Sequence, residues 1–207
     1  LTARWLQLNV DDPKIFVLPH TMLATSPEVI EAAYEWLGRG GQTNEYMATS
    51  IGALIRCAAE YHKSFLRKIL NFARTWLRIN HDNRECGIIY GEMIWATRTK
   101  ADYGKARLWH KQHRSNESAW FVLSKLLEIA CAEQKRPGAY ELEQARVFLR
   151  DPANRMEKPR LIGSLLDVLV DAETTAWARE KYERTGGLWM LSKLLMHAPN
   201  KRLVTEG

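Results

Sequence analysis

Two histidines lie three residues apart in the middle of the chain, next to a tryptophan. His110 and His113 follow Trp109, and on a helix this spacing places two imidazoles on one face, where they could bind a metal ion. A metal site needs further ligands, and none is evident nearby; Lys111 and Arg114 flank the pair instead. We therefore expect no metal site and interpret the segment as part of a solvated basic face.

Positive side chains and aromatic rings alternate around these histidines. The rings are those of Tyr103 and Trp109, and the positive residues are Arg98, Lys100, Lys105, Arg107, Lys111 and Arg114. Basic and aromatic residues together can bind a nucleic-acid strand. The alternative is that both rings point into a helical core, while the charges are solvated or form a docking face for an acidic partner. We favour this alternative, because non-specific phosphate binding needs only charge.

The positive charge is concentrated in one part of the chain. The 207 residues carry a net charge of +6, and residues 61–115 contain 12 Lys or Arg against 4 Asp or Glu. Such a segment could meet nucleic acid, an acidic protein or an anionic membrane surface. No apolar run reaches the roughly 18 to 20 residues of a membrane-spanning helix, so we expect no membrane span.

The sequence contains no motif typical of catalysis or cofactor binding. GxSxG, GxGxxG and the Walker loop are all missing, and the Gly-rich residues 38–41 follow a predicted helix rather than a strand. Cys57, Cys86 and Cys131 are widely spaced and form no CxxC pair, so we interpret them as small buried residues in a reducing compartment. We predict a protein without catalytic, cofactor-binding or metal-binding residues.

A five-residue phrase occurs five times and indicates which elements carry these side chains. Each copy is a large apolar residue, a Gly or Ser, a variable residue and two apolar residues. The copies begin at Ile51, Tyr90, Leu123, Ile162 and Leu191. A second phrase follows the first four copies, with its alanines at Ala73, Ala106, Ala145 and Ala178. Two phrases in constant order, at steps of 29 to 39 residues, predict an array of helix pairs.

Small residues in both phrases have a physical reason. Two helices approach closely only where a side chain is small, which explains the alanines of the second phrase. A glycine inside a helix costs about 1 kcal/mol relative to alanine, so the glycines of the first phrase also indicate close helix approach. Capping and turn signals place the repeats at 26–38, 43–80, 84–114, 115–151 and 159–185, followed by a capping helix over 188–197.

The ends of the chain show no helical periodicity. We expect an N-terminal arm over 1–14, a helical-repeat domain over 15–198 and a C-terminal tail over 199–207. Most of the eight tryptophans fall on apolar stripes and belong to the predicted core. Trp5, in the arm, is the exception, and it is a candidate anchor for a partner because aromatic anchors dominate interface energies.

The phrase Tyr90–Ile94, followed by Asp102–Ala106, resembles the pentatricopeptide repeat, and the array is also similar to tetratricopeptide repeats. The resemblance covers roughly residues 43–198. It implies an all-α fold, a right-handed α-solenoid of about five helix pairs with a C-terminal capping helix. In RNA-reading pentatricopeptide proteins a polar residue near the start of the first helix contacts the base. The matching positions here are Gly52, Gly91, Ser124, Gly163 and Ser192. Glycine has no side-chain donor or acceptor for a base edge.

The resemblance therefore implies a scaffold. Pentatricopeptide-like proteins without a reading code occur as accessory proteins of mitochondrial ribosomes and as a subunit outside the catalytic head of some protist mitochondrial ATP synthases. The size, the basic charge and a first residue other than Met fit such a subunit of the mitochondrial matrix. The alternative compartment is the cytoplasm. We expect a non-catalytic scaffold or adaptor that binds protein subunits of an assembly such as ATP synthase or the mitochondrial ribosome. The alternative is a pentatricopeptide-type RNA-binding protein that uses the basic face of residues 61–115.

Overall fold

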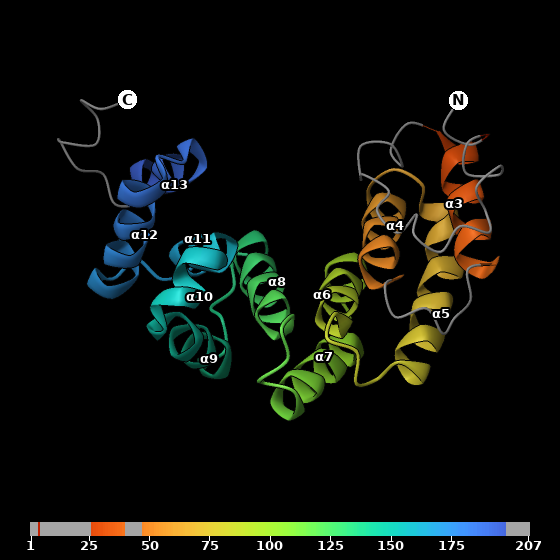
Figure 1. Ribbon diagram of the computed structural model, residues 1–207, viewed down its shortest axis with the longest axis horizontal. Helices are drawn as coiled ribbons and strands as arrows, with labels where there is room; N and C mark the ends of the chain where they lie inside the picture. The colour runs from red at the N-terminus through yellow and green to blue at the C-terminus, as the bar shows by residue number, and fades with distance from the viewer. Residues whose placement is uncertain (1–3, 5–25, 40–46, 198–207) are drawn as a thin grey trace. The chain divides into compact units, whose positions relative to one another are not determined.

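All regular structure in the described part of the chain is helical (Figure 1). The computed structural model describes residue 4 and residues 26–39 and 47–197, and these ranges contain eleven helices and no strand. The all-α class predicted from the sequence is confirmed. None of the helices in these ranges combines the length and the apolar character that crossing a membrane requires.

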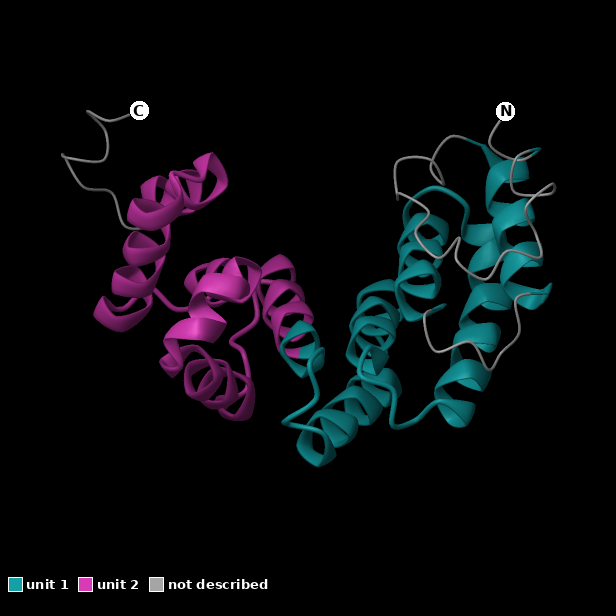
Figure 2. Ribbon diagram, viewed as in Figure 1, with its two compact units in different colours: residues 1–122 teal, residues 123–207 magenta. Residues whose placement is uncertain are grey.

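The predicted ends of the chain lie outside the described residues. This holds for the tail over 199–207 and, apart from Arg4, for the arm over 1–14. The candidate anchor Trp5 belongs to the arm, so its role stays a prediction. The described chain divides into two compact units within residues 1–122 and 123–207 (Figure 2).

In the first unit, two central helices pack against the others. Its helices are α3 (Pro27–Arg39), α4 (Ala48–Glu60), α5 (Lys63–Ile79), α6 (Cys86–Thr97), α7 (Lys100–Gln112) and the start of α8 (Ala119–Ala132). Helix α4 packs against α3, α5 and α6, and α6 also packs against α5 and α7. Helix α6 is apolar on nearly all sides, as a helix enclosed by others must be. Helix α5 is amphipathic and buries only one face.

In the second unit, helix α11 is central. The helices that follow α8 are α9 (Ala139–Arg150), α10 (Pro152–Glu157), α11 (Pro159–Leu166), α12 (Ala172–Thr185) and α13 (Leu188–His197). Helix α11 packs against α9, α10, α12 and α13. The bounds of α11, α12 and α13 agree with the predicted segments 159–185 and 188–197. Gly186 ends α12 with a φ of +61°, a conformation that glycine adopts without steric cost.

The short helix α10 is not among the predicted elements. The pair Asp151-Pro152 predicts the end of α9, and α9 does end at Arg150. The same pair also begins α10: the Asp151 carboxylate accepts a hydrogen bond from the Ala153 N–H at 2.9 Å. Pro152 occupies the first turn, where no N–H donor is needed. A stop signal and a start signal therefore coincide.

The small residues of both phrases are buried, apart from the exposed Ser192. Ala73, Ala106, Ala145 and Ala178 are all fully buried. A Cβ atom on Gly52 would lie 3.0 Å from Ile88 of α6, and one on Gly163 would lie 2.3 Å from Trp189 of α13. Close approach therefore explains these two glycines, as expected.

The first phrase also keeps one register in its polar contacts. At three of the four steps between copies, the side chain four positions after the small residue contacts the side chain one position after the small residue of the next copy. The contacts are an ion pair of Arg56 with Glu92, a hydrogen bond from Ser164 to Glu128 at 3.4 Å and an ion pair of Lys193 with Asp167 at 2.5 Å. The chemistry differs at each step, and the sequence phrase does not reveal it.

One expectation about the core is wrong, and one tryptophan is more exposed than its apolar helix suggests. Cys57 and Cys86 are buried as expected, but Cys131 is exposed near the end of α8. Trp189 is 48% exposed although it belongs to an apolar helix. Both residues lie on helices that are mostly apolar, so hydrophobic pattern alone does not show which of their faces is covered.

Candidate docking surface

Helix α5 separates apolar and cationic side chains onto opposite faces. Its buried residues are Ile69, Leu70, Phe72, Ala73, Trp76 and Leu77. Its exposed cations are Lys63, Arg67, Lys68, Arg74 and Arg78, and the helix contains no Asp or Glu. The solvent-facing side of α5 therefore carries positive charge only.

Helix α7 and its flanking residues carry the predicted docking residues, and all of these are exposed. They are Arg98, Lys100, Lys105, Arg107, Lys111 and Arg114. Asp102, the acidic residue of α7, is buried. Its carboxylate accepts a hydrogen bond from the Thr99 hydroxyl at 2.9 Å and lies 3.8 Å from Nη2 of Arg74 on α5. This contact links α5 and α7 at one point. We call the exposed cations of α5, of α7 and of the residues flanking α7 the basic surface.

Cations dominate the exposed charges of this region. Every one of the 12 cations between residues 61 and 115 is exposed. Of the four acids, Glu92 and Asp102 are buried, Glu85 is half-buried and only Asp82 is exposed. Glu92 forms an ion pair with Arg56 of α4. Two of the negative charges are thus withdrawn from the surface.

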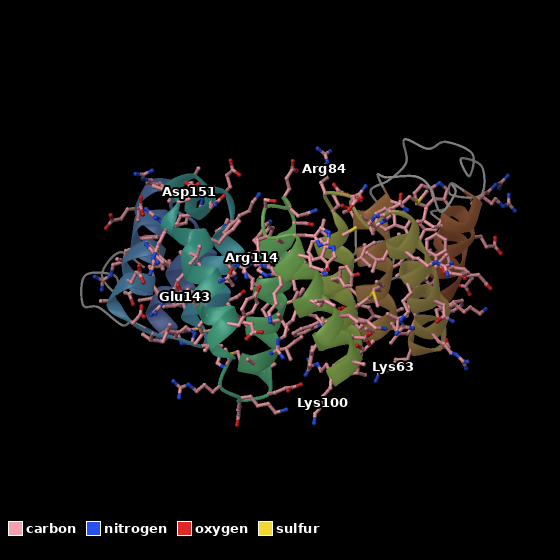
Figure 3. All side chains as sticks on the ribbon, turned by 90° about the horizontal axis from the view of Figure 1, so that it is seen from below. Lys63, Arg84, Lys100, Arg114, Glu143 and Asp151 are labelled. Atoms are coloured by element: carbon pink, nitrogen blue, oxygen red, sulfur yellow. The ribbon has the colours of Figure 1, made fainter. Side chains whose placement is uncertain are left out.

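Not every cation of the segment faces the same way (Figure 3). Lys63 and Lys100 project from the same edge of the first unit, where α5 and α7 begin. Arg84, in the loop before α6, projects from the opposite edge. Its guanidinium also lies 4.0 Å from the Glu117 carboxylate. Arg84 is therefore not part of the basic surface.

The predicted aromatic partners of these cations belong to the interior. Trp109 is buried and stacks between Tyr90 and His113, with ring centroids 5.2 and 5.1 Å away. Tyr103, on the same helix, is half-buried. Proteins that bind single strands stack the bases on exposed aromatic rings. Trp109 is buried and therefore offers no such ring.

The two histidines have different surroundings. His110 is buried, and Nδ1 of His113 lies 2.9 Å from the Trp109 carbonyl oxygen. Within the ranges that the structure describes, no group of three or more His, Cys, Asp or Glu side chains could hold a metal ion.

The positions that match the base readers of pentatricopeptide proteins are mostly enclosed. Gly52, Gly91, Ser124 and Gly163 are buried, and only Ser192 is exposed. Ser124 Oγ lies 2.8 Å from Ser164 Oγ of α11. The side of the first helix that a reader would need therefore faces a neighbouring helix.

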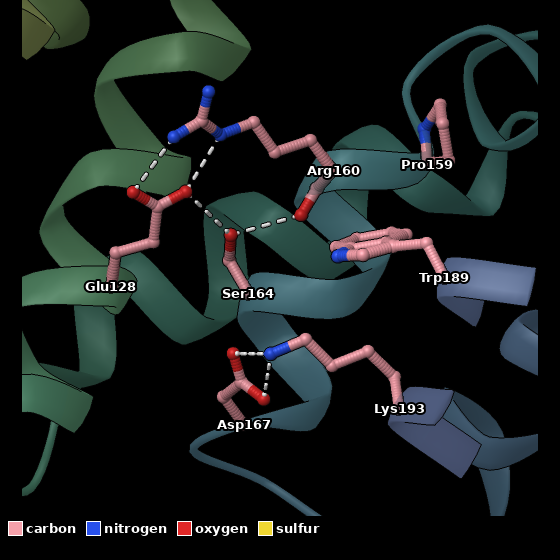
Figure 4. Close-up of a pocket in the computed structure, with 7 residues that line it drawn as sticks. All are labelled: Glu128, Pro159, Arg160, Ser164, Asp167, Trp189 and Lys193. Atoms are coloured by element: carbon pink, nitrogen blue, oxygen red, sulfur yellow. Dashed lines mark hydrogen bonds and ion pairs between the residues drawn. The ribbon is translucent and has the colours of Figure 1, made fainter. Parts of the chain in front are cut away.

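A second candidate surface, which the sequence did not reveal, lies in the second unit between α8, α11 and α13 (Figure 4). A cavity of about 480 Å³ is lined by Glu128, Pro159, Arg160, Ser164, Asp167, Trp189 and Lys193. Arg160 donates from Nε and Nη2 to the Glu128 carboxylate at 2.7 and 3.0 Å. The Lys193 ammonium lies 2.5 and 2.6 Å from the two oxygens of Asp167. The register of the first phrase would have located Glu128, Ser164, Asp167 and Lys193, had it been extended to polar positions.

Each carboxylate of this cavity contacts two basic side chains. Glu128 contacts Arg160 and also Lys125, whose ammonium is 3.3 Å away. Burial favours the neutral form of Glu128, but the hydrogen bond from Arg160 and the charge of Lys125 outweigh it, so the pKa of Glu128 is lowered. Asp167 contacts Lys193 and Nε2 of His197, which is 2.8 Å away.

Comparison of the chain with protein-family models, with curated proteins and with solved structures finds no match.

Proposed function

We propose that this chain is a non-catalytic scaffold or adaptor that docks onto an acidic surface of a partner protein through the basic surface. The observation that carries the proposal is the distribution of charge in residues 61–115, where all 12 cations are exposed, eleven of them on the basic surface, while Glu92 and Asp102 are buried. A surface of one sign speeds association with a surface of the opposite sign and disfavours partners of like sign.

We also propose that the helix pairs continue as a right-handed solenoid, as the resemblance to pentatricopeptide repeats implies. The constant register of the first phrase supports this. Gly52 and Gly163 each meet a residue three positions before the small residue of the next copy, and the polar contacts of Arg56, Glu128 and Asp167 recur at one spacing. Arrays of this kind present a continuous surface to a partner, and neighbouring repeats stabilise one another.

RNA binding is the second candidate, because the exposed cations would also attract phosphates. Sequence-specific reading is disfavoured by the burial of Gly52, Gly91, Ser124 and Gly163. Stacking on Trp109 is disfavoured because that ring is buried. The basic surface alone would give weak, salt-sensitive binding without sequence preference.

The resemblance further implies that the assembly is mitochondrial. We propose that the protein lies in the matrix. Its partners would be protein subunits of a complex such as ATP synthase or the mitochondrial ribosome. Organelle fractionation tests the compartment directly. Recovery of the native protein in another compartment would refute this part of the proposal without affecting the role of the basic surface.

The experiment that tests docking is affinity purification of the tagged full-length protein from its native cells. The test variant is Arg67→Glu with Arg107→Glu, which reverses one exposed cation on α5 and one on α7. The control variant is Arg136→Glu with Arg184→Glu, which makes the same charge change at exposed positions of the second unit. We expect the wild type and the control to recover stoichiometric protein subunits, and the test variant to recover less than a tenth as much.

Two results would overturn the proposal. Recovery of the wild type as a free monomer would contradict an assembly subunit. Tight RNA binding with strong sequence preference, measured over a salt titration, would contradict a scaffold. Weak RNA binding that disappears with salt would agree with a basic surface made for an acidic protein.

A further inference from the structure

We infer that two copies of this chain associate through the outer face of α13, with the two helices antiparallel and crossing at Ser192. In this arrangement Leu188 of each copy packs against Met196 of the other. The inference goes beyond the proposed function, because it concerns a surface in the second unit that is separate from the basic surface.

The outer face of α13 is apolar and uncharged. Four residues of this ten-residue helix are exposed, and they are Leu188, Trp189, Ser192 and Met196. Leu188 is 80% exposed and Met196 is 68% exposed. Of the eight large apolar side chains that are exposed in the described ranges, three lie on this one helix. Residues spaced by three or four positions are neighbours on a helix face, so these side chains form a patch of the kind that marks an interaction site.

The basic side chains of α13 are engaged elsewhere. The Lys193 ammonium lies 2.5 and 2.6 Å from the oxygens of Asp167, and Nε2 of His197 lies 2.8 Å from the same carboxylate. The side of α13 that packs against α11 and α12 is formed by the buried Met190, Leu191 and Leu194. The helix is therefore apolar on both sides, which is typical of a helix that is covered on both sides.

The first phrase indicates that a helix covers this face. In earlier copies the small residue lies where the next helix comes close: a Cβ atom on Gly52 would meet Ile88, and one on Gly163 would meet Trp189. The small residues of the first four copies are buried, whereas Ser192, the small residue of the fifth copy, is exposed. The outer face of α13 thus has the feature that admits a neighbouring helix.

The spacing of its residues makes this face complementary to itself. Leu188 and Met196 each lie four residues from Ser192, which is about 6 Å along the helix axis. A twofold axis at Ser192 therefore places Leu188 of one copy on Met196 of the other and repeats the contact on the opposite side, as a symmetric dimer requires. The small side chain at the crossing point allows the two helices to approach closely.

These features select the occupant. An acidic surface, which is the partner proposed for the basic surface, would find no exposed cation among the four residues of this face. Among the first-phrase helices in the described ranges, only α13 has an exposed small residue, so α13 is the helix with which a second copy offers the matching face.

The first test is sedimentation equilibrium of the full chain. Four residues are far fewer than the roughly 20–30 per partner of a stable complex, so we expect a weak dimer with a Kd on the order of 100 µM. The indole N–H signal of Trp189 in a ¹H–¹⁵N spectrum, assigned through Trp189→Phe, should shift with protein concentration. The buried Trp36 and Trp76 serve as internal references whose signals do not move.

Charge changes test the antiparallel contact. Met196→Glu and Leu188→Lys should each weaken the dimer at least tenfold, because each places an unpaired charge in an apolar contact. Val147→Glu, at an exposed apolar residue of α9 in the same unit, is the control and should leave the Kd unchanged. An equimolar mixture of the Leu188→Lys and Met196→Glu chains should associate at least tenfold more tightly than either alone, because the new lysine of one copy faces the new glutamate of the other. Damage to the fold cannot produce this recovery.

A cross-link tests the crossing point. Two cysteines on a twofold axis between packed helices lie within the reach of a disulfide. Ser192→Cys should therefore form a covalent dimer under mild oxidation when the exposed Cys131 is replaced by Ser. Arg184→Cys, at an exposed position of α12, is the control in the same background and should remain largely uncoupled.

The outcomes separate this inference from the proposed function. A chain that stays monomeric at about ten times the expected Kd overturns the inference and leaves a helix of another protein as the occupant of this face. A dimer that survives Met196→Glu, or one that Ser192→Cys does not trap, would also overturn it, because the two copies would then meet elsewhere. None of these results affects docking through the basic surface, which the variant with Arg67 and Arg107 reversed tests by itself.

Discussion

Gly163 of α11 lies directly beneath the indole ring of Trp189 on α13. A Cβ atom on Gly163 would come within 2.3 Å of Cη2 and 2.9 Å of Cζ2 of that ring. These atoms form the far end of a side chain that is half exposed, so the ring can swing outward instead of the helices moving apart. The glycine therefore determines where the exposed tryptophan lies, more than it determines whether α11 and α13 pack.

We expect Gly163→Ala to displace the Trp189 ring with only a small change in stability. The loss of the ring contact is partly offset by the gain of about 1 kcal/mol that alanine brings inside a helix, so the net change in unfolding free energy should be within about 1 kcal/mol. The Trp189 indole signal should shift strongly while those of Trp36 and Trp76 stay in place. An unchanged Trp189 signal would contradict this account.

Gly87 should respond in the opposite way, because rigid backbone surrounds it. A Cβ atom there would lie 2.2 Å from the Ser118 carbonyl oxygen, and the Gly87 N–H donates to Ser118 Oγ at 2.8 Å. We expect Gly87→Ala to lower the unfolding free energy by about 1–3 kcal/mol. Gly104, inside α7, has nothing within 4 Å of a Cβ position. Gly104→Ala should therefore stabilise the protein by about 0.5–1 kcal/mol, and urea unfolding measures both variants.

The sequence predicted helices well wherever a periodic stripe ended at a strong capping signal. The start at Ser26-Pro27 is confirmed, with the Val29 N–H 3.4 Å from Ser26 Oγ, and so is the end at Gly186. Asp151-Pro152 was harder, since one dipeptide stops α9 and starts α10. Capping residues determine where a helix ends because they pair with the free backbone N–H and C=O groups of its first and last turns, which are close in sequence.

The candidate sites were predicted less completely, because they depend on burial. The six predicted cations of the α7 region are exposed, and so are the five cations of α5, which the basic segment 61–115 already contains. The sequence does not show that the α5 cations lie opposite a covered apolar face. The cavity of the second unit joins Glu128, Arg160 and Lys193 across up to 65 residues of sequence. The register of the first phrase indicates the positions of Glu128 and Lys193, but it does not indicate that Arg160 pairs with Glu128.

The ion pair between Arg56 and Glu92 joins α4 to α6, and Glu92 is buried. We expect Glu92→Gln to lower the unfolding free energy by about 1–3 kcal/mol, because it weakens a charge-assisted contact at a buried position. The double variant Arg56→Met with Glu92→Met should lose less than the sum of the single changes. Arg84→Gln at the exposed pair with Glu117 is the control and should cost no more than about 0.5 kcal/mol. Additive losses at Arg56 and Glu92 would show that the pair is not coupled.

The three cysteines should differ sharply in reactivity. Burial raises the pKa of the Cys57 thiol to about 11 and that of Cys86 to about 12, and only the thiolate reacts with disulfide reagents. Cys131 is exposed. At pH 8, an aromatic disulfide reagent should therefore label one thiol in the native protein and three after denaturation. Cys131→Ser should abolish the native reaction, and labelling of Cys57 or Cys86 without denaturant would contradict their burial.

Glu128 should make the stability of the protein depend on pH under acidic conditions. Because its pKa in the folded state is lowered from the ordinary value of 4.5, the unfolded chain takes up a proton first as the pH falls. The stabilisation by Glu128 is therefore complete well above pH 4.5 and is lost as the pH falls toward its folded pKa. The difference in unfolding free energy between the wild type and Glu128→Gln should narrow from pH 7 to pH 3.5 in urea titrations. The Arg160→Gln variant lacks the hydrogen bond from Arg160 that lowers the pKa of Glu128, while burial still raises that pKa. In this variant, Glu128 should therefore cause a smaller loss of unfolding free energy as the pH falls. A difference between the wild type and Glu128→Gln that stays constant over this range would contradict the lowered pKa.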